Sequence, residues 1–220
     1  DSVDFELEEY QGQSDEYDQM VRKFIRPFDL SQSPLFRIGI LDGNNESLLM
    51  MDMDHIISDG ASIDILIRDL ISIYQGEELV ELQLQYKDFA VWQNDFLASE
   101  EMKEQEKFWL DTFTGEIPLL NLPTDYARSS EMSFEGQTLE FKLNKEITGK
   151  LNQLIKETNT TLYMALLTIF NVLLSRYSGQ DDIVIGSPIA GRGHSDLEDI
   201  IGMFVNTMAM RNYPDNDKIF

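Results

Sequence analysis

Residues 51–60 constrain the fold of this chain more than any other stretch, because they join a strand-like segment to a helix-like one. Residues 48–53 are apolar apart from Asp52, and residues 61–74 repeat apolar side chains with the period of a helix. An acid, a histidine, a second acid and a glycine lie between the two segments. The pattern predicts a strand that turns directly into a helix and presents polar side chains at the junction.

The same periodicity predicts an alternation of strands and helices along the rest of the chain, and therefore a mixed α/β fold. The turn-forming residues 42–45 suit an antiparallel hairpin, and strands are expected at residues 35–41, 47–53, 138–143 and 183–185. Further helices are expected from Ser14 to Pro27, from 86 to 97, from Ser99 to Gly115, after Asn144 and from Thr161 to Tyr177. The last of these is apolar on nearly every side, which predicts a helix buried in the core.

Residues 116–136 differ in composition from the segments on either side. They contain Pro118, Pro123, a Thr-Asp turn and the run Arg128-Ser129-Ser130. Such a stretch is typical of a long crossover loop. We therefore expect the chain to divide into two lobes near this stretch.

The composition excludes several classes of protein. The chain has 220 residues, of which 42% are hydrophobic, so it can bury a real core. Its formal charge of −23, from 40 acidic and 17 basic residues, would repel nucleic-acid phosphates, and acidity of this kind is typical of a solvated surface. Because the chain has no cysteine and two histidines, we expect neither disulfides nor a thiolate or histidine-rich metal site.

The sequence gives no sign of a targeting or membrane-spanning segment. No stretch has the roughly 18 consecutive apolar residues that a spanning helix needs, and residues 1–6 have neither a basic region nor an apolar signal core. We expect a cytoplasmic protein with neither a membrane nor a nucleic acid as its partner.

His55 has the position of a catalytic side chain, since it lies at the predicted junction with Asp54, Ser58 and Asp59 around it. A neutral imidazole can accept a proton from an attacking amine or alcohol near neutral pH. A single histidine is, however, more often a hydrogen-bonded structural residue. Spacing alone leaves both roles open.

Two roles are also open to Asp59. It can orient the imidazole of His55, or it can pair with a distant arginine and brace the loop. An acid at a buried turn needs a counter-charge or several backbone donors. Arg192, between Gly191 and Gly193 after an apolar strand, is the best-placed partner, and the alternative for it is a solvated loop cation.

Three separated segments carry a set of motifs. Residues 54–60 read Asp-His-Ile-Ile-Ser-Asp-Gly, residues 86–92 read Tyr-Lys-Asp-Phe-Ala-Val-Trp and residues 201–207 read Ile-Gly-Met-Phe-Val-Asn-Thr. In this order they resemble the HHxxxDG, YxDFAxW and IGxFVNT motifs of condensation domains from nonribosomal peptide synthetases. The likeness covers essentially the whole chain, since three further segments are also similar to that family: residues 28–30, 122–126 and 182–192.

The resemblance implies a fold of two chloramphenicol-acetyltransferase-like lobes. Residues 1–95 would be the second half of the N-terminal lobe, residues 137–220 the first half of the C-terminal lobe, and residues 96–136 the connecting helix and crossover loop. Phosphopantetheine arms of carrier proteins would enter a tunnel between the lobes from both faces. The resemblance implies no cofactor and no metal bound by the domain itself.

The activity that the resemblance implies is amide formation, an acyltransferase reaction of antibiotic or other secondary-metabolite biosynthesis. The amine of an aminoacyl group on a downstream carrier protein attacks the aminoacyl or peptidyl thioester on an upstream carrier protein. The resemblance also implies an adenylation domain adjacent to the condensation domain. Carried over by position, His55 would assist the attack, Asp59 would be structural, and Gly60 would keep the tunnel open. The remaining structural or tunnel residues would be Arg192, Ser58 and Asn206.

Asp54 departs from the family's pattern, because it stands where the first histidine of HHxxxDG is expected. We include it with His55 among the candidate catalytic residues. It also creates the pattern Asp54-x4-Asp59-x2-Ser62, which resembles the DxxxxDxxS motif of heterocyclisation domains. The retained His55 favours an amide-forming member, while a heterocyclisation or epimerisation variant, or a catalytically impaired module that docks carrier proteins, stays open.

Overall fold

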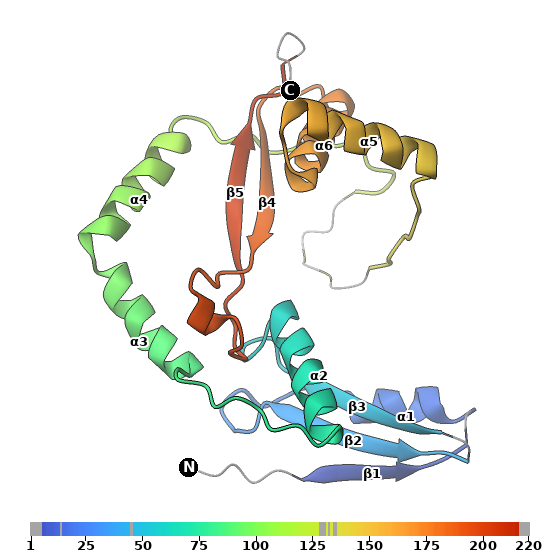
Figure 1. The fold of residues 1–220 in the computed structure, drawn as a ribbon. Coiled ribbons are helices and arrows are strands. Elements are labelled where there is room, and N and C mark those ends of the chain that lie inside the picture. Colours follow the sequence, from blue (N-terminus) through green and yellow to red (C-terminus); the bar gives the residue numbers. More distant parts are fainter. Residues whose placement is uncertain are drawn as a thin grey trace. The chain divides into compact units, whose positions relative to one another are not determined.

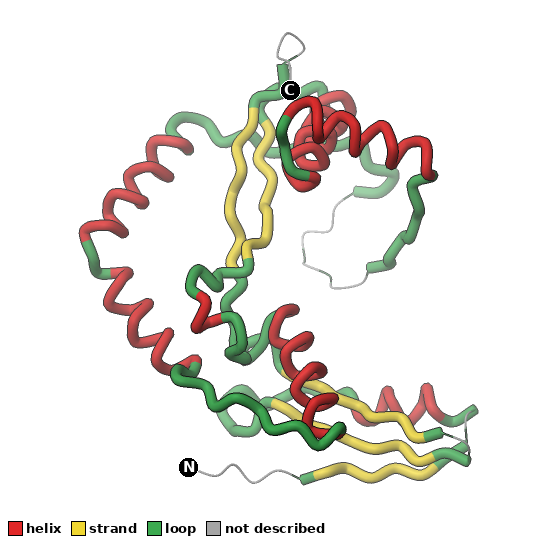
Figure 2. The backbone as a smooth tube through the Cα atoms, viewed as in Figure 1, coloured by secondary structure: helices red, strands yellow, loops and turns green. Residues whose placement is uncertain are grey.

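The computed structural model describes residues 6–13, 15–44, 46–127, 131, 133 and 136–215. The chain forms two units, which are Asp1–Ser99 with Pro188–Asn206 (unit one) and Glu100–Ser187 with Thr207–Phe220 (unit two). Figure 1 labels the helices and strands of both units, and Figure 2 colours the chain by type of structure.

Unit one contains a three-stranded sheet in the order β1-β2-β3. Its strands are β1 (Leu7–Gln11), β2 (Phe36–Asp42) and β3 (Ser47–Met53). The predicted hairpin is confirmed, because β2 and β3 run antiparallel with Phe36 opposite Met53. β1 runs parallel to β2, and its sequence, Leu-Glu-Glu-Tyr-Gln, is too polar to be predicted as a strand from periodicity.

The helix α1 (Tyr17–Phe24) packs on one face of this sheet. A helix is predicted here, although its predicted first residue, Ser14, lies outside the described residues. Phe24 is buried together with Leu41 of β2 and Met50 of β3. These three large side chains form the apolar core between the helix and the sheet.

The predicted strand-to-helix junction is confirmed. β3 leads through the loop 54–59 into α2 (Gly60–Tyr74). Asp59 caps the helix, because its carboxylate accepts a hydrogen bond of 2.9 Å from the Ser62 N–H. Gly76 ends this region with a φ of 82°, a left-handed conformation that glycine adopts without steric cost.

Two further segments complete unit one. The helix α3 (Tyr86–Leu97) lies where a helix is predicted, and it begins with a capping box between Gln85 and Asp88. The segment 188–206 is mostly irregular and contains the short 3-10 helix η1 (Ser195–Leu197). This irregular segment supplies half of the candidate site described below.

Unit two has three helices and most of a two-stranded sheet among its described residues. The helices are α4 (Glu100–Thr112), α5 (Lys145–Thr158) and α6 (Leu162–Ser178). The strands β4 (Ile183–Ile189) and β5 (Asn206–Asn212) pair and run in opposite directions (Figure 1). The predicted helix cap is confirmed, since the Asn144 side chain accepts a hydrogen bond of 2.9 Å from the Ile147 N–H. The mixed α/β class is confirmed as well.

The predicted strand at residues 138–143 is wrong. These residues form neither helix nor strand, and Leu139 and Phe141 are 86% and 79% exposed. A strand needs a neighbour that exchanges backbone hydrogen bonds with it. No described strand lies beside this segment, so its alternating side chains do not form the face of a sheet.

The prediction that α6 is buried on every side is also wrong for the described residues. Its buried residues are Ala165, Asn171 and Leu174, whereas Met164 and Phe170 are about half exposed. The described elements cover one side of the helix only. Its all-round apolar sequence therefore leaves a wide apolar surface open.

No single helix among the described residues is both long and apolar enough to cross a membrane. The helices α5 and α6 pass that test together on length and composition, but a bend of 107° separates them.

Arg211 of β5 holds several parts of unit two together. Its guanidinium donates to both carboxylate oxygens of Asp182, at 3.0 and 2.6 Å. It also donates to the carbonyl oxygens of Thr112, Thr114 and Glu116, at the end of α4 and after it. Because its side chain is 7% exposed, these contacts are made by a buried cation.

We expect Arg211→Lys to lower the melting temperature of the complete domain, because an ammonium group cannot reproduce the planar fork of donors and leaves carbonyl groups unpaired. The matched control is Lys150→Ala, since Lys150 pairs with Glu146 on the exposed surface of α5 and exposed pairs contribute little. Differential scanning calorimetry measures both variants. Equal melting temperatures for Arg211→Lys and the wild type would contradict the role of Arg211.

Candidate active site

The loop between β3 and α2 holds His55 in a defined orientation. Nδ1 of the imidazole lies 2.6 Å from the carbonyl oxygen of Ser58. Because a carbonyl oxygen only accepts hydrogen bonds, Nδ1 carries the hydrogen, and in the neutral ring Nε2 keeps the lone pair. His55 as a residue is exposed.

Asp59 is the buried acid of the site, with a side chain that is 3% exposed. Oδ1 accepts hydrogen bonds from the Ser62 N–H (2.9 Å), the Ser62 hydroxyl (2.7 Å) and Arg192 (2.9 Å). Oδ2 accepts a hydrogen bond of 3.0 Å from the Phe204 N–H. Since these groups occupy the carboxylate and His55 bonds to its own loop, Asp59 does not orient the imidazole.

The same contacts set the charge of Asp59. Burial opposes its ionisation, but the hydrogen bonds from Ser62, Phe204 and Arg192 outweigh burial and lower the pKa of Asp59 to about 2. The carboxylate is therefore ionised near neutral pH and has no proton to exchange with a substrate. Its geometry is that of a brace.

Arg192 is buried as well, with a side chain that is 6% exposed. Besides Asp59, it donates to the carbonyl oxygens of Leu197 (2.8 Å) and Ile200 (2.6 Å), and its guanidinium carbon lies 4.1 Å from the centre of the Phe204 ring. The ion pair predicted from the sequence is present, and the alternative of a solvated loop cation is wrong. The pair joins the start of α2 to the segment 188–206.

Ser62 belongs to this network, although sequence reasoning does not single it out. Its fully buried hydroxyl accepts from the Gly202 N–H (3.0 Å) and from Arg192 (3.1 Å), and lies within hydrogen-bonding distance of Asp59 Oδ1 and of the Gly202 carbonyl oxygen (2.9 Å). In the sequence it appears only as the end of the pattern that starts at Asp54. Nothing in a single sequence shows that its partner is a backbone 140 residues away.

The second and third motifs meet at Phe204. Its ring lies 5.1 Å from that of Tyr86 and 4.7 Å from that of Phe89, both on α3, and the Tyr86 hydroxyl donates to the Met203 carbonyl oxygen at 2.8 Å. Gly202 makes the approach possible, because a Cβ there would lie 2.1 Å from the Tyr86 ring. The third motif is thus packed against α3 and hydrogen-bonded to the acid of the first motif.

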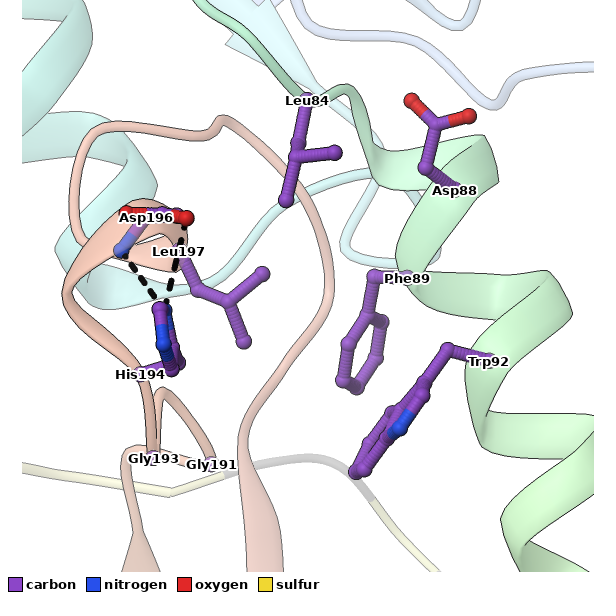
Figure 3. A pocket seen from close by; sticks show the side chains of 9 residues that line it. All are labelled: Leu84, Asp88, Phe89, Trp92, Gly191, Gly193, His194, Asp196 and Leu197. Atoms are coloured by element: carbon purple, nitrogen blue, oxygen red, sulfur yellow. Dashed lines mark hydrogen bonds and ion pairs between the residues drawn. The ribbon is translucent and has the colours of Figure 1, made fainter.

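An apolar pocket of about 590 Å³ lies beside this aromatic cluster in unit one. Phe89 and Trp92 of α3 line one side of it, and Leu197 lies opposite, with His194 and Asp196 nearby (Figure 3). His55 is not among the lining residues. The pocket and the His55 loop are therefore separate features of unit one.

The other predicted site residues have simpler surroundings. Gly60 is exposed at the start of α2, and a Cβ there would meet nothing within 4 Å. Ser58 is buried, and its hydroxyl donates to the Asp54 carbonyl oxygen at 3.3 Å. Asp54 accepts a hydrogen bond of 2.9 Å from the Ile56 N–H, and Asn206 is exposed at the start of β5. Their roles in a reaction stay predictions.

We expect Asp59→Asn to remove part of the acid sensitivity of folding. Because the pKa of Asp59 is about 2 in the folded state and about 4 in an unfolded chain, its charge stabilises the fold by roughly 2.5 kcal/mol. That contribution is present above about pH 4 and is lost as the pH falls toward 2. Chemical denaturation of the complete domain as the pH is lowered measures the effect. Asp64→Asn, an exposed position on α2, is the control, and a wild-type pH dependence in Asp59→Asn would contradict the brace.

Comparison with known proteins identifies the family. A family model described as Condensation domain matches residues 1–220. The chain is 51% identical over 221 residues to tyrocidine synthase 3 of Brevibacillus parabrevis and 49% identical over 221 residues to gramicidin S synthase 2 of Aneurinibacillus migulanus. All of this chain is covered in both comparisons, but the chain spans 3% and 5% of the two synthases.

A solved structure shows the same fold at lower identity. The X-domain from teicoplanin biosynthesis matches with a TM-score of 0.87 and 23% identity, over 99% of this chain and 51% of that one. The chain therefore spans about half the length of this relative. With a family-model match over residues 1–220, these synthase relatives and a chloramphenicol-acetyltransferase-like fold, the chain belongs to the condensation domains of nonribosomal peptide synthetases.

Proposed function

We propose that the complete domain containing this chain forms an amide bond between two carrier-bound substrates. The donor is an aminoacyl or peptidyl thioester on an upstream carrier protein, and the acceptor is the amine of an aminoacyl thioester on a downstream one. Phosphopantetheine arms present both substrates, and an adenylation domain next to the condensation domain supplies one of them. The observation that carries the proposal is the Nδ1 contact of His55 with Ser58, which leaves Nε2 as the acceptor on an exposed residue.

The chemistry requires one bond to form and one to break. The acceptor amine attacks the thioester carbon, the new C–N bond forms, and the C–S bond breaks to release the thiol of the donor arm. The proton lost by the amine must reach the departing sulfur. His55 Nε2 can accept this proton, or hold the amine by a hydrogen bond, because Ser58 fixes the ring with Nδ1 protonated.

Asp59 supports this reaction through structure rather than proton transfer. Its pKa of about 2 keeps it ionised, and Ser62, Phe204 and Arg192 occupy its oxygens. Since Asp59 is the last residue of the His55 loop and caps α2, it anchors the end of that loop to the segment 188–206. Arg192 is therefore a structural partner of Asp59 and is not proposed to contact the substrates.

The pattern of Asp54, Asp59 and Ser62 is the one observation that favours a second function, heterocyclisation. In this chain, however, the contacts of Asp59 and Ser62 are with protein groups of the buried brace. The pattern is accounted for by structure, and His55 remains the exposed basic group of the loop. We therefore propose amide formation over heterocyclisation.

We expect His55→Ala to abolish the dipeptidyl thioester in the complete synthetase module supplied with loaded donor and acceptor carrier proteins. His194→Ala is the matched control, because His194 is the second of the two histidines, is exposed and lies outside the His55 loop. Mass spectrometry of the acceptor carrier measures the product. Undiminished product with His55→Ala would contradict the role of His55.

Mass separates amide formation from heterocyclisation, and chiral analysis of the substrate hydrolysed from the carrier separates epimerisation from carrier docking. An amide adds the donor group to the acceptor, heterocyclisation removes water in addition, and epimerisation leaves the carrier-bound mass unchanged while it inverts a stereocentre. A docking module binds both carriers and forms no product even in the wild type.

We expect Gly60→Leu to lower product formation while the domain stays folded. A Cβ at Gly60 meets nothing within 4 Å, so a side chain there projects into open space beside the His55 loop. Gly202→Ala is the contrasting variant, because its Cβ would collide with the Tyr86 ring and the melting temperature should fall. Calorimetry and the product assay measure the two effects, and full activity of Gly60→Leu would contradict the predicted role of Gly60 in keeping the tunnel open.

A further inference from the structure

We infer that Asp54 is a positioning residue for His55, and that it acts as a hydrogen-bond acceptor rather than as a charge. This inference rests on the proposed role of His55. In this inference, Asp54 stabilises the turn that contains His55. The inference also explains how an aspartate can replace the first histidine of the family's motif without removing the function of the second.

The contacts of Asp54 are those of a turn-forming residue. Its N–H donates to the Leu35 carbonyl oxygen just before β2, at 3.0 Å, which ties the start of the loop to the sheet. Its side-chain Oδ1 accepts the Ile56 N–H at 2.9 Å, and its carbonyl oxygen accepts the Ile57 N–H at 3.2 Å. Aspartate is favoured at the first position of such turns, because its short side chain can bond to the backbone two residues on.

The imidazole of His55 lies within this small network. His55 occupies the second position of the turn, between Asp54 and Ile56. The Ile56 N–H donates a hydrogen bond to the Asp54 side chain across it. On the other side, the Ser58 carbonyl oxygen accepts from His55 Nδ1 and the Ser58 hydroxyl donates to the Asp54 carbonyl oxygen. Loss of the Asp54 acceptor would leave the Ile56 N–H without this hydrogen bond. The turn at Asp54, which is one of the two structures that position the His55 ring, would then be less rigid.

A histidine can make the same contact, and this chain contains an example. His194 Nδ1 accepts a hydrogen bond of 3.2 Å from the N–H of Asp196, which is again two residues further along (Figure 3). Asp54 and Ile56 have the same spacing and the same kind of bond. An imidazole nitrogen and a carboxylate oxygen are thus interchangeable as acceptors at the first position of this kind of turn.

Three substitutions separate an acceptor from a charge. Asp54→Asn keeps an oxygen acceptor and removes the charge, Asp54→His supplies a nitrogen acceptor, and Asp54→Ala removes both. In the complete module we expect the first two to keep kcat for dipeptide formation within about twofold, and Asp54→Ala to lower it about tenfold with little change in the KM for the loaded acceptor carrier. Asp64→Ala, which removes an exposed charge from α2, is the control.

The pH dependence of kcat and the exchange of the Ile56 amide hydrogen complete the test. Asp54→Asn should keep the wild-type pH profile, and only Asp54→Ala should speed amide exchange at Ile56 with an unchanged melting temperature. An equal loss of kcat in Asp54→Asn and Asp54→Ala would overturn the inference, because the charge would then be what matters. Wild-type kcat and amide exchange in Asp54→Ala would overturn it as well.

Failure of the proposed function gives a different result. If His55→Ala forms product at the wild-type rate, His55 has no catalytic role, and no Asp54 variant should then change kcat through it. The amide exchange at Ile56 reports on the turn in either case. Faster exchange at Ile56 in Asp54→Ala, together with wild-type product formation, would show that Asp54 stabilises the turn. It would also show that this turn does not affect catalysis, which would overturn the inference.

Discussion

The buried ion pair between Asp59 and Arg192 is the interaction on which unit one depends. Both side chains are removed from water, and an ionised group in such a place is stable only when its charge and its hydrogen bonds are matched. Ser62 and the Phe204 N–H supply the remaining partners of Asp59. One pair of charges thus connects the start of α2 with a segment that follows it by more than a hundred residues in the chain.

This brace separates structural work from chemical work within a single motif. Asp59 is committed to protein contacts, so its carboxylate is neither a base nor a partner for the imidazole. His55 is held by its own loop, through Ser58 on one side and the turn at Asp54 on the other. The imidazole of His55 is therefore positioned by hydrogen bonds that do not use the buried acid, and a change at Asp54 need not disturb Asp59.

Both units have apolar surfaces that no described element covers. Ile63, Ile67 and Ile71 on α2 are exposed, as are large side chains on α6, and the segment 138–143 has no strand beside it among the described residues. The chain spans about half the length of the solved relative that it matches. Amphipathic and apolar patterns indicate which faces of a helix or strand can be buried, but a face is buried only where another element packs against it.

Most of the local structure and the family of this protein can be predicted from its sequence, although β1 is missed and the strand expected at residues 138–143 does not form. The hairpin, the junction at residues 54–60 and the helices follow from periodicity and capping chemistry. The pairing of Asp59 with Arg192 is one of two roles that the sequence leaves open for Asp59, and the structure selects it. The three-dimensional structure was needed to show that Ser62 bonds to Gly202, that Phe204 packs on α3 and that His55 turns Nδ1 toward Ser58. Those contacts join residues far apart in the chain or depend on side-chain direction, and neither property is encoded in the local pattern of a single sequence.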